Sequence, residues 1–445
     1  MPDHFYNNKK VEYIIYNGIA LTMNLQKAII HDAALAIDKG IIVALDTTEN
    51  IKKLYSADSE INAQGLIIMP GLINGHTHAA MAILRGIADD QPLQEWLKKI
   101  WETEKKFVNS NFVYWGALLA CCEMLKSGIT TFVDMYFYSK DTARAAALAG
   151  MRAIIAETIM DSSTPGASTP DQAYKYVRSF IEEWQTNEII TPAVAPHSLY
   201  ACSLKTINES NELANFYQKP LLMHVSETKK EVADCLKKYH TRPIEYLYQN
   251  NIVSSNLIAA HCVHVDEKEI RLLSQAKAGV IYNPQSNLKL GSGVAPIDMM
   301  YGYGVNIGLG TDSAASNNTL DLWQEIKTGL ILQKTFTRES EPIDAYTILE
   351  MATIKGAQAI GKADQIGSLE IGKKADLILV DHENPHQIPN KNYYSLLAYS
   401  TKAADVNFVM INGKIIMKNK VLVSLNGLSE ETIINEVKKL RKAIG

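Results

Sequence analysis

Two histidines separated by a single residue, His76 and His78, have the residue type and spacing of metal ligands. Residues two apart on a β-strand project to the same side, so both imidazoles could bind one ion. The pair directly follows a short apolar run, and Gly75 lets the backbone come close to such a site. The spacing therefore predicts part of a metal site at the end of a strand.

Three further ionisable residues follow later apolar runs and could complete this site. His224 could supply a third nitrogen, and Asp312 could be a third or fourth ligand. A mixed set of histidines and a carboxylate, with one position left for water, is typical of a catalytic zinc or iron ion. His261 closes another apolar run and could orient or deprotonate the water. The pattern predicts metal-assisted hydrolysis.

Other polar residues near the ends of apolar runs allow more than one interpretation. Glu227 could face the substrate. His197 could form a hydrogen bond with a substrate ring, or it could cap the loop that follows. The amides of Asn283, Gln285 and Asn287 could bind substrate, but an Asn-Pro step with nearby serine and glycine is equally typical of a turn.

These side chains need a scaffold that brings the ends of distant strands together. Eight short apolar runs, each ending in a polar or ionisable residue, are separated by segments of helical length. Parallel strands buried on both faces have continuous apolar sequences, and catalytic groups of a (β/α)8 barrel gather at the carboxyl ends of its strands. The sequence therefore predicts an α/β fold with a (β/α)8 TIM barrel over residues 67–366.

The two ends of the chain have the pattern of strands and turns rather than of βα repeats. A barrel takes about 250 residues, so a chain of 445 residues has room for a second unit. Neither residues 1–66 nor residues 367–445 hold enough strands for a stable sheet of their own. We expect one small β-sandwich built from both termini, with the barrel inserted between them and a closing helix at the end.

Composition and missing motifs exclude several classes of protein. Lysine and arginine are scattered and the net charge is -4, which argues against a nucleic-acid binder. The absence of a leader pattern and of a membrane-length apolar run predicts a cytoplasmic protein with no membrane partner. The five cysteines form no C-x-x-C pair and indicate reduced thiols. Motifs of serine hydrolases, nucleotide hydrolases and dehydrogenases are missing, and we expect a small-molecule substrate.

Four ordered motifs carry a resemblance to a known family. PGLINGHTH, HVSE, AAHCVH and GLGTDSAASNN resemble the amidohydrolase superfamily, in particular its 5-methylthioadenosine/S-adenosylhomocysteine deaminase group and chlorohydrolase-like relatives. The similarity spans nearly the whole chain. It implies one divalent metal ion, usually zinc although iron or manganese can occupy similar sites, held by His76, His78, His224 and Asp312. Binuclear members carry a carboxylated lysine on the fourth strand, where this chain has TPAVAPHSLY, which implies a mononuclear site.

The resemblance also implies a reaction, which is hydrolytic deamination of an adenosine-type nucleoside such as 5′-methylthioadenosine, adenosine or S-adenosylhomocysteine. The implied catalytic residues are Glu227, His261 and Asp312. The implied substrate-binding residues are Glu104, His197, Glu227 and Ser316, with Glu104 on the ribose hydroxyls. Because members usually form homodimers or tetramers, we also expect a homo-oligomer.

The sequence leaves alternatives open for the 5′ tail and for the ring of the substrate. Glu157 stands where related enzymes can place a substrate-facing arginine, so we expect the anionic tail of S-adenosylhomocysteine to be disfavoured. The alternative reaction is deamination or dechlorination of another N-heterocycle, such as guanine, 8-oxoguanine, a pterin or a triazine, but Glu104 favours a nucleoside. Some relatives have lost their metal ligands and serve as structural or binding proteins, whereas this chain keeps every expected ligand.

Overall fold

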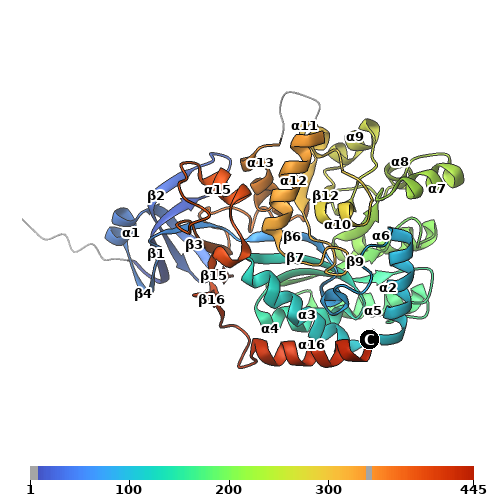
Figure 1. Ribbon diagram of the computed structural model, residues 1–445, viewed down its shortest axis with the longest axis horizontal. Helices are drawn as coiled ribbons and strands as arrows, with labels where there is room; N and C mark the ends of the chain where they lie inside the picture. The colour runs from blue at the N-terminus through green and yellow to red at the C-terminus, as the bar shows by residue number, and fades with distance from the viewer. Residues whose placement is uncertain (1–8, 337–342, 445) are drawn as a thin grey trace, which may run out of the picture.

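The computed structural model describes residues 9–336 and 343–444, and its centre is a barrel of eight parallel strands. The strands follow one another around the barrel in chain order (Figure 1). They are β6 (Leu72–Thr77), β7 (Ile129–Tyr136), β8 (Arg152–Ile159), β9 (Ile190–Pro196), β10 (Leu221–Val225), β11 (Leu257–His261), β12 (Gly279–Tyr282) and β13 (Asn306–Leu309). The predicted (β/α)8 barrel is confirmed.

The barrel closes between its last and first strands. The backbone amide of Asp312, just after β13, donates to the carbonyl of His76 at 2.9 Å. The amide of Thr311 donates to Asn74 Oδ1 at 3.0 Å. Two expected metal ligands therefore lie at the seam of the barrel, on segments that are far apart in the sequence.

Helices connect the strands and cover the outside of the barrel. The longer ones are α3 (Ser110–Lys126), α4 (Ser139–Ala149), α5 (Pro170–Trp184), α6 (Leu204–Tyr217), α7 (Lys229–Tyr239), α9 (Glu267–Ala276) and α12 (Leu322–Phe336), and shorter ones are α8 (Pro243–Gln249), α11 (Ile297–Gly302) and α13 (Ala345–Met351). Their starts follow local rules. Thr169 caps α5 by accepting from the amide of Gln172, and Pro170 fits the first turn, where no amide donor is needed.

Alternate residues of each strand point into the barrel and form its inner core. Ile73, Val133, Ile154, Leu222 and Ile281 belong to this core. Helix α14 (Ile354–Ala359) lies at one end of the barrel and adds apolar side chains to the same core. Because inward and outward positions alternate, the position of a residue along its strand decides whether its side chain faces the pocket or the surrounding helices.

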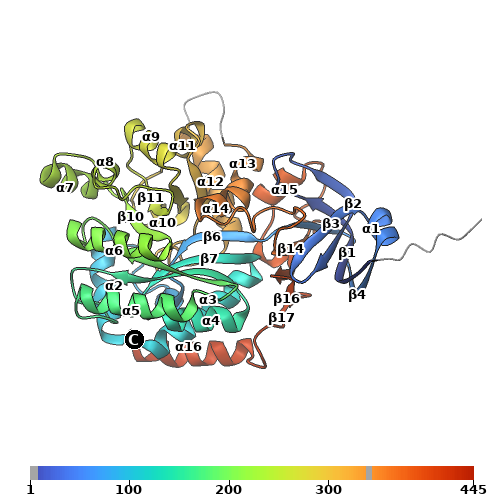
Figure 2. The same ribbon diagram turned by 180° about the vertical axis from the view of Figure 1, so that it is seen from behind.

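The two ends of the chain form a second, mixed sheet, seen from both sides in Figures 1 and 2. Its N-terminal strands are β1 (Lys9–Leu21), β2 (Ile29–Asp38), β3 (Ile41–Thr47), β4 (Tyr55–Asn62) and β5 (Leu66–Pro70), with α1 (Thr48–Leu54) between β3 and β4. Its C-terminal strands are β14 (Leu377–Asp381), β15 (Val406–Ile411), β16 (Lys414–Lys418) and β17 (Val421–Leu422). Strand β5 pairs with both β1 and β14 and so joins the two ends. The expected unit built from both termini is confirmed.

The apolar run before His76 is divided between the two units. Its first half is β5 in the terminal sheet, and its second half is β6 in the barrel. Gly71 lies at the change, where a Cβ atom would come within 2.1 Å of the side chain of Thr130. Only a residue without a side chain fits so close to β7.

A buried ion pair holds the terminal sheet to the barrel. Arg152 begins β8, and its Nε and Nη2 atoms donate to the two carboxylate oxygens of Asp376 at 2.6 and 3.0 Å. Paired donors in this geometry fix the relative orientation of two groups better than a single hydrogen bond does. The ion pair therefore fixes the position of the terminal sheet relative to the barrel at the start of β8.

The remaining helices lie near the pocket or at the end of the chain. The 3-10 helix η1 (Ala79–Leu84), α2 (Leu93–Phe107) and α10 (Pro284–Lys289) follow strands β6 and β12. Helix α15 (Tyr393–Tyr399) and the 3-10 helix η2 (Ala403–Asp405) precede β15. The expected closing helix is α16 (Glu430–Ile444), which packs beside α3 (Figure 1). Within the described ranges, no helix has the length and apolar character needed to cross a bilayer.

Candidate active site

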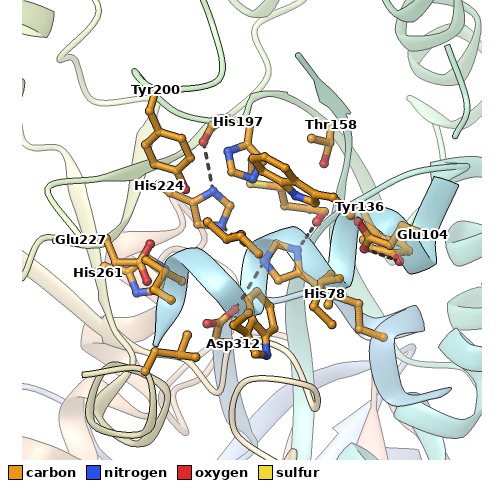
Figure 3. A pocket seen from close by; sticks show the side chains of 18 of the residues that line it. His78, Glu104, Tyr136, Thr158, His197, Tyr200, His224, Glu227, His261 and Asp312 are labelled. Atoms are coloured by element: carbon orange, nitrogen blue, oxygen red, sulfur yellow. Dashed lines mark hydrogen bonds and ion pairs between the residues drawn. The ribbon is translucent and has the colours of Figure 1, made fainter. Parts of the chain in front are cut away.

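Three histidines and one aspartate converge at the carboxyl end of the barrel, as Figure 3 shows for His78, His224 and Asp312. His78 Nε2 lies 3.3 Å from His224 Nε2 and 3.4 Å from Asp312 Oδ1. His76 Nε2 lies 3.6 Å from the same aspartate oxygen. The structure thus brings together all four of the expected metal ligands.

The chemistry of these four groups fits a divalent metal ion. His76 Nε2 is buried without a hydrogen-bond partner. Burial lowers the pKa of His76 to about 4 and that of His224 well below its usual value, so both rings are neutral. Burial alone would raise the pKa of Asp312, but the neighbouring rings of His76 and His78 hold it well below its usual range. Neutral nitrogens and one carboxylate are the donors that such an ion requires.

Backbone carbonyls orient two of the imidazoles. His78 Nδ1 donates to the carbonyl of Met135, and His224 Nδ1 donates to the carbonyl of His197 at 3.0 Å. A proton held at Nδ1 leaves the lone pair on Nε2, which is the atom that faces the cluster in both rings. The tautomers needed for metal binding are therefore set by the strands themselves.

Ser316 lies behind Asp312. It is fully buried, and its hydroxyl donates to Asp312 Oδ2 at 3.0 Å, beside a second donor, Ser286, at 2.5 Å. It is not among the residues that line the pocket. Ser316 is thus placed to orient Asp312, and its contact with a substrate stays a prediction.

Two residues of the cluster have unusual backbone conformations. His261 has a φ of 75° and Asp312 a φ of 58°, both in the left-handed region. Non-glycine residues adopt this region rarely, and such strain is concentrated at functional sites. For His261 the turn directs to the cluster a side chain that simple alternation from the inward residue Ile258 would place outside.

The two remaining catalytic candidates lie beside the metal ligands. Glu227 lines the pocket, and burial raises the pKa of its carboxyl, which favours the protonated form. Ser292 donates to Glu227 Oε1 at 3.4 Å. His261 lies among the possible ligands in a group with His76 and His224. Figure 3 shows Glu227 and His261 close together on one side of the pocket.

Three buried residues support this pair: Asn283 and Asn287, which the sequence indicated only as possible substrate-binding or turn residues, and Glu231, which it did not identify. Asn287 Oδ1 accepts from His261 Nδ1 at 2.8 Å, and Asn283 Nδ2 lies 3.3 Å from the same nitrogen. Glu231 accepts from the amides of Ser226 and Glu227, each at 2.8 Å, and fixes the turn that carries Glu227. Asn283 immediately precedes α10 and Asn287 lies on it, and their separation of four residues would have indicated a shared target.

Helix α2 forms one wall of the pocket through residues that recur at helical spacing. The lining residues on this helix are Leu93, Trp96, Leu97, Ile100, Trp101 and Glu104. Glu104 is 4% exposed, and its carboxylate accepts from the hydroxyl of Tyr136 at 2.7 Å. Burial raises the pKa of Glu104 to about 7. A single carboxylate on an otherwise apolar wall is suited to accept hydrogen bonds from paired hydroxyls.

His197 lines the pocket beside the metal cluster, with its ring centroid 4.6 Å from that of His224. Its ring lies 6.3 Å from that of Trp101 and 5.6 Å from that of Tyr200, measured between centroids. Burial lowers the pKa of His197 to about 3, so the ring is neutral. The ring therefore lies where a substrate could meet it, and the hydrogen bond to a substrate ring stays a prediction.

Glu157 does not face the pocket, and the expectation that it would meet the substrate tail is wrong. Its carboxylate accepts from the amides of Tyr138 at 3.2 Å and Ser139 at 2.8 Å, at the start of α4. The inner core takes Ile154 and Ala156 from β8, and Thr158 continues that alternation into the pocket. Glu157 is an outward position, and it caps a helix instead of binding substrate.

Comparisons with known proteins agree with this arrangement. The model of the amidohydrolase family matches residues 67–416. A 5-methylthioadenosine/S-adenosylhomocysteine deaminase of Syntrophobacter fumaroxidans is 39% identical over 94% of this chain and 96% of its own length. A protein of the same name from Thermodesulfovibrio yellowstonii is 41% identical over 97% of each chain. The crystal structure of a zinc-bound adenosine deaminase from Xanthomonas campestris has a TM-score of 0.96 and 33% identity, covering 98% of this chain and 99% of that one.

Proposed function

This chain belongs to the amidohydrolase family, and we propose that it hydrolyses the ring amino group of an adenosine-type nucleoside, releasing ammonia and the inosine analogue. The observation that carries the proposal is the convergence of Glu227 and His261 on a cluster of three histidines and Asp312 at the pocket floor. The relatives named for deamination support the same reaction.

His76, His78, His224 and Asp312 would hold one divalent ion, and the zinc of the similar adenosine deaminase makes zinc our choice. When bound, such an ion supplies a Lewis acid that makes a coordinated water more acidic. The side chains of the protein perform the other steps of the reaction. We propose that their roles are those of base, acid and substrate holder.

His261 and Asp312 act as the bases that accept a proton from the attacking water. The Nδ1–H of His261 is engaged by Asn287, so its Nε2 lone pair is the free acceptor. The water oxygen forms a bond to the ring carbon that carries the amino group. Protonated Glu227 donates to the adjacent ring nitrogen, so that no negative charge builds up on the ring.

The second half of the reaction returns the protons. The proton taken from water is delivered to the amino group, the carbon–nitrogen bond breaks, and ammonia leaves. The ring nitrogen keeps the proton from Glu227, while the remaining hydroxyl proton passes to Glu227 and restores its acid form. The balance is one nucleoside and one water converted to one oxo-nucleoside and one ammonia.

Substrate selection in this proposal depends on Glu104 and His197. Glu104 accepts hydrogen bonds from the two ribose hydroxyls, and the neutral ring of His197 contacts the purine. A free base lacks the hydroxyls and leaves the Glu104 carboxylate unsatisfied. The Glu104 contact therefore favours a nucleoside over guanine, a pterin or a triazine. The expected homo-oligomer and cytoplasmic location stay predictions.

The test is a deaminase screen on purified, zinc-loaded enzyme. Ammonia release and product mass are measured for adenosine, 5′-methylthioadenosine, adenine, guanine and a chlorinated triazine. We expect the two nucleosides to be converted and adenine to have a kcat/KM about tenfold or more lower, since a hydrogen bond to a charged group contributes about 1.5–3 kcal/mol. The proposal fails if no adenosine derivative releases ammonia, or if a free base or the triazine is the better substrate.

A further inference from the structure

We propose that Glu325, on α12, is a positioning residue that holds α10 in the place where this short helix can orient both bases of the reaction. This inference rests on the proposed function, because it takes His261 and Asp312 as those bases. Helix α12 contributes no residue to the lining of the pocket. Glu325 would therefore act only through the residues that bond to its carboxyl group.

The carboxyl group of Glu325 is fully buried and accepts hydrogen bonds from two different segments. Oε2 accepts from the backbone amide of Gln285 at 3.1 Å, in the first turn of α10. Oε1 accepts from Asn317 Nδ2 at 2.6 Å, in the loop after β13. Burial raises the pKa of Glu325 to about 8, which reflects the cost of placing an ionisable group in the core. A leucine would fill a similar space without this cost, so packing alone does not explain the carboxyl group.

Helix α10 carries one contact to each base within a single turn. Ser286, the residue after Gln285, donates from Oγ to Asp312 Oδ2 at 2.5 Å. Asn287, one residue further on, accepts from His261 Nδ1 at 2.8 Å. Since α10 is only six residues long, a displacement of its first turn would move both contacts together.

The second oxygen of Glu325 ties α10 to the segment that carries Asp312. Asn317 Nδ2 also donates to the carbonyl of Thr311 at 2.7 Å, directly before the aspartate. The backbone amide of Asn317 donates to the carbonyl of Ser313 at 2.9 Å, directly after it. One buried carboxyl group thus connects the helix that orients the two bases to the turn that carries one of them.

The experiment compares Glu325→Gln with a matched variant on the same helix. Glutamine keeps the size of the side chain but has one accepting oxygen instead of two, so at least one of the two contacts is lost. Gln333→Leu is the control, because this buried residue of α12 loses two hydrogen bonds that do not reach α10 or the bases. kcat and KM for adenosine and 5′-methylthioadenosine, zinc content and the free energy of unfolding are measured for each protein. A crystal structure of each variant gives the distance between Asn287 and His261.

We expect kcat of Glu325→Gln to fall about tenfold, with KM and zinc content little changed, as for other residues that orient a catalytic group indirectly. The distance between Asn287 and His261 should lengthen in this variant only. Gln333→Leu should lose stability but keep the wild-type kcat. A wild-type kcat in Glu325→Gln, or an equal loss in both variants, would overturn the inference while leaving the deaminase reaction in place. Failure of Glu325→Gln to fold would overturn it too, by showing a structural role alone.

A double-mutant cycle tests the route through α10. If Glu325 acts through Asn287, then Asn287→Leu already removes much of what Glu325 contributes to His261. We therefore expect Glu325→Gln to lower kcat by a smaller factor in the Asn287→Leu protein than in the wild type. Equal factors in the two proteins would overturn the inference. If the wild-type enzyme releases ammonia from neither nucleoside, the proposed function itself falls and takes this inference with it.

Discussion

Asn287 Oδ1 accepts the Nδ1 proton of His261 at 2.8 Å, and this contact fixes which nitrogen of the ring is free to accept a proton. His261 ends β11, whereas Asn287 lies on α10, which follows the next strand of the barrel. The base of the proposed reaction thus depends on a residue that touches neither the metal ligands nor the pocket. Asn287 is a positioning residue, and its contribution can be measured.

Replacing Asn287 by leucine removes the acceptor while keeping a similar volume. We expect kcat to fall about 10- to 100-fold, as is usual for a lost contact of this kind, with KM little changed. Asn287→Asp keeps an oxygen acceptor and should retain more of the activity. Steady-state kinetics with zinc content measured on each variant provide the check. Wild-type kcat in the leucine variant, or equal losses in both variants, would show that the contact does not position the base.

Metal removal should abolish activity reversibly. Dialysis against a chelator is expected to remove the ion and the deaminase activity together, and added zinc should restore both. His224→Ala loses one of the converging nitrogens and should not recover. His386→Ala is a matched control, since that histidine contacts Asp405, outside the metal cluster. Full activity in chelated enzyme, shown to be metal-free by mass spectrometry, would rule out a metal-assisted reaction.

Glu104 should account for the preference for ribose. The wild-type enzyme is expected to convert adenosine about 10- to 100-fold more efficiently than 2′-deoxyadenosine, the range that a lost hydrogen bond to a charged group gives. Glu104→Leu should reduce this ratio toward one by lowering kcat/KM for adenosine more than for the deoxynucleoside. Kinetics on both substrates with both proteins form a double-mutant cycle. An unchanged ratio in the variant would place the ribose elsewhere.

Glu157 gives a prediction about stability rather than activity. Burial raises its pKa from 4.5 to about 7, so the folded protein binds the proton more tightly than the unfolded chain. The stabilising contribution of the protonated carboxyl is fully present below about pH 4.5 and is lost as the pH rises through 7, by up to roughly 3 kcal/mol. Glu157→Gln cannot titrate and should have a flatter dependence of unfolding free energy on pH.

Denaturant unfolding of the zinc-loaded proteins at several pH values between 5 and 8 tests this. Glu102→Gln, at an exposed position on α2, is the control and should follow the wild-type curve. If the Glu157→Gln curve has the same slope as the wild-type curve, the buried carboxyl does not contribute in this pH range.

Much of the fold could be predicted from the sequence because its signals are local. Buried parallel strands give continuous apolar runs, and the two ends of the chain have strand patterns too short to stand alone. His76, His78 and His224 each lie at a strand end, so barrel topology alone brings them together. For these three histidines, the predicted strand was enough to place the side chain at the metal cluster.

The rest of the site depends on contacts that no local pattern contains. Asn287 meets His261 only because α10, which follows β12, brings it to the end of β11, and the left-handed turn at His261 is a conformation that its sequence does not indicate. Glu157 is a different case. Ile154 and Ala156 face the inner core, so alternation along β8 already predicts that the side chain of Glu157 points outward.

Strand β5 pairs with β1 on one side and with β14 on the other, and the whole barrel lies between β5 and β14 in the chain. On the ribosome, the N-terminal strands therefore emerge long before the strand that completes their sheet. Until residues 377–381 are synthesised, the edge of β5 is open to pairing with other chains. The arrangement of the termini thus makes about the last sixth of the chain a determinant of whether the first sixth folds without mispairing.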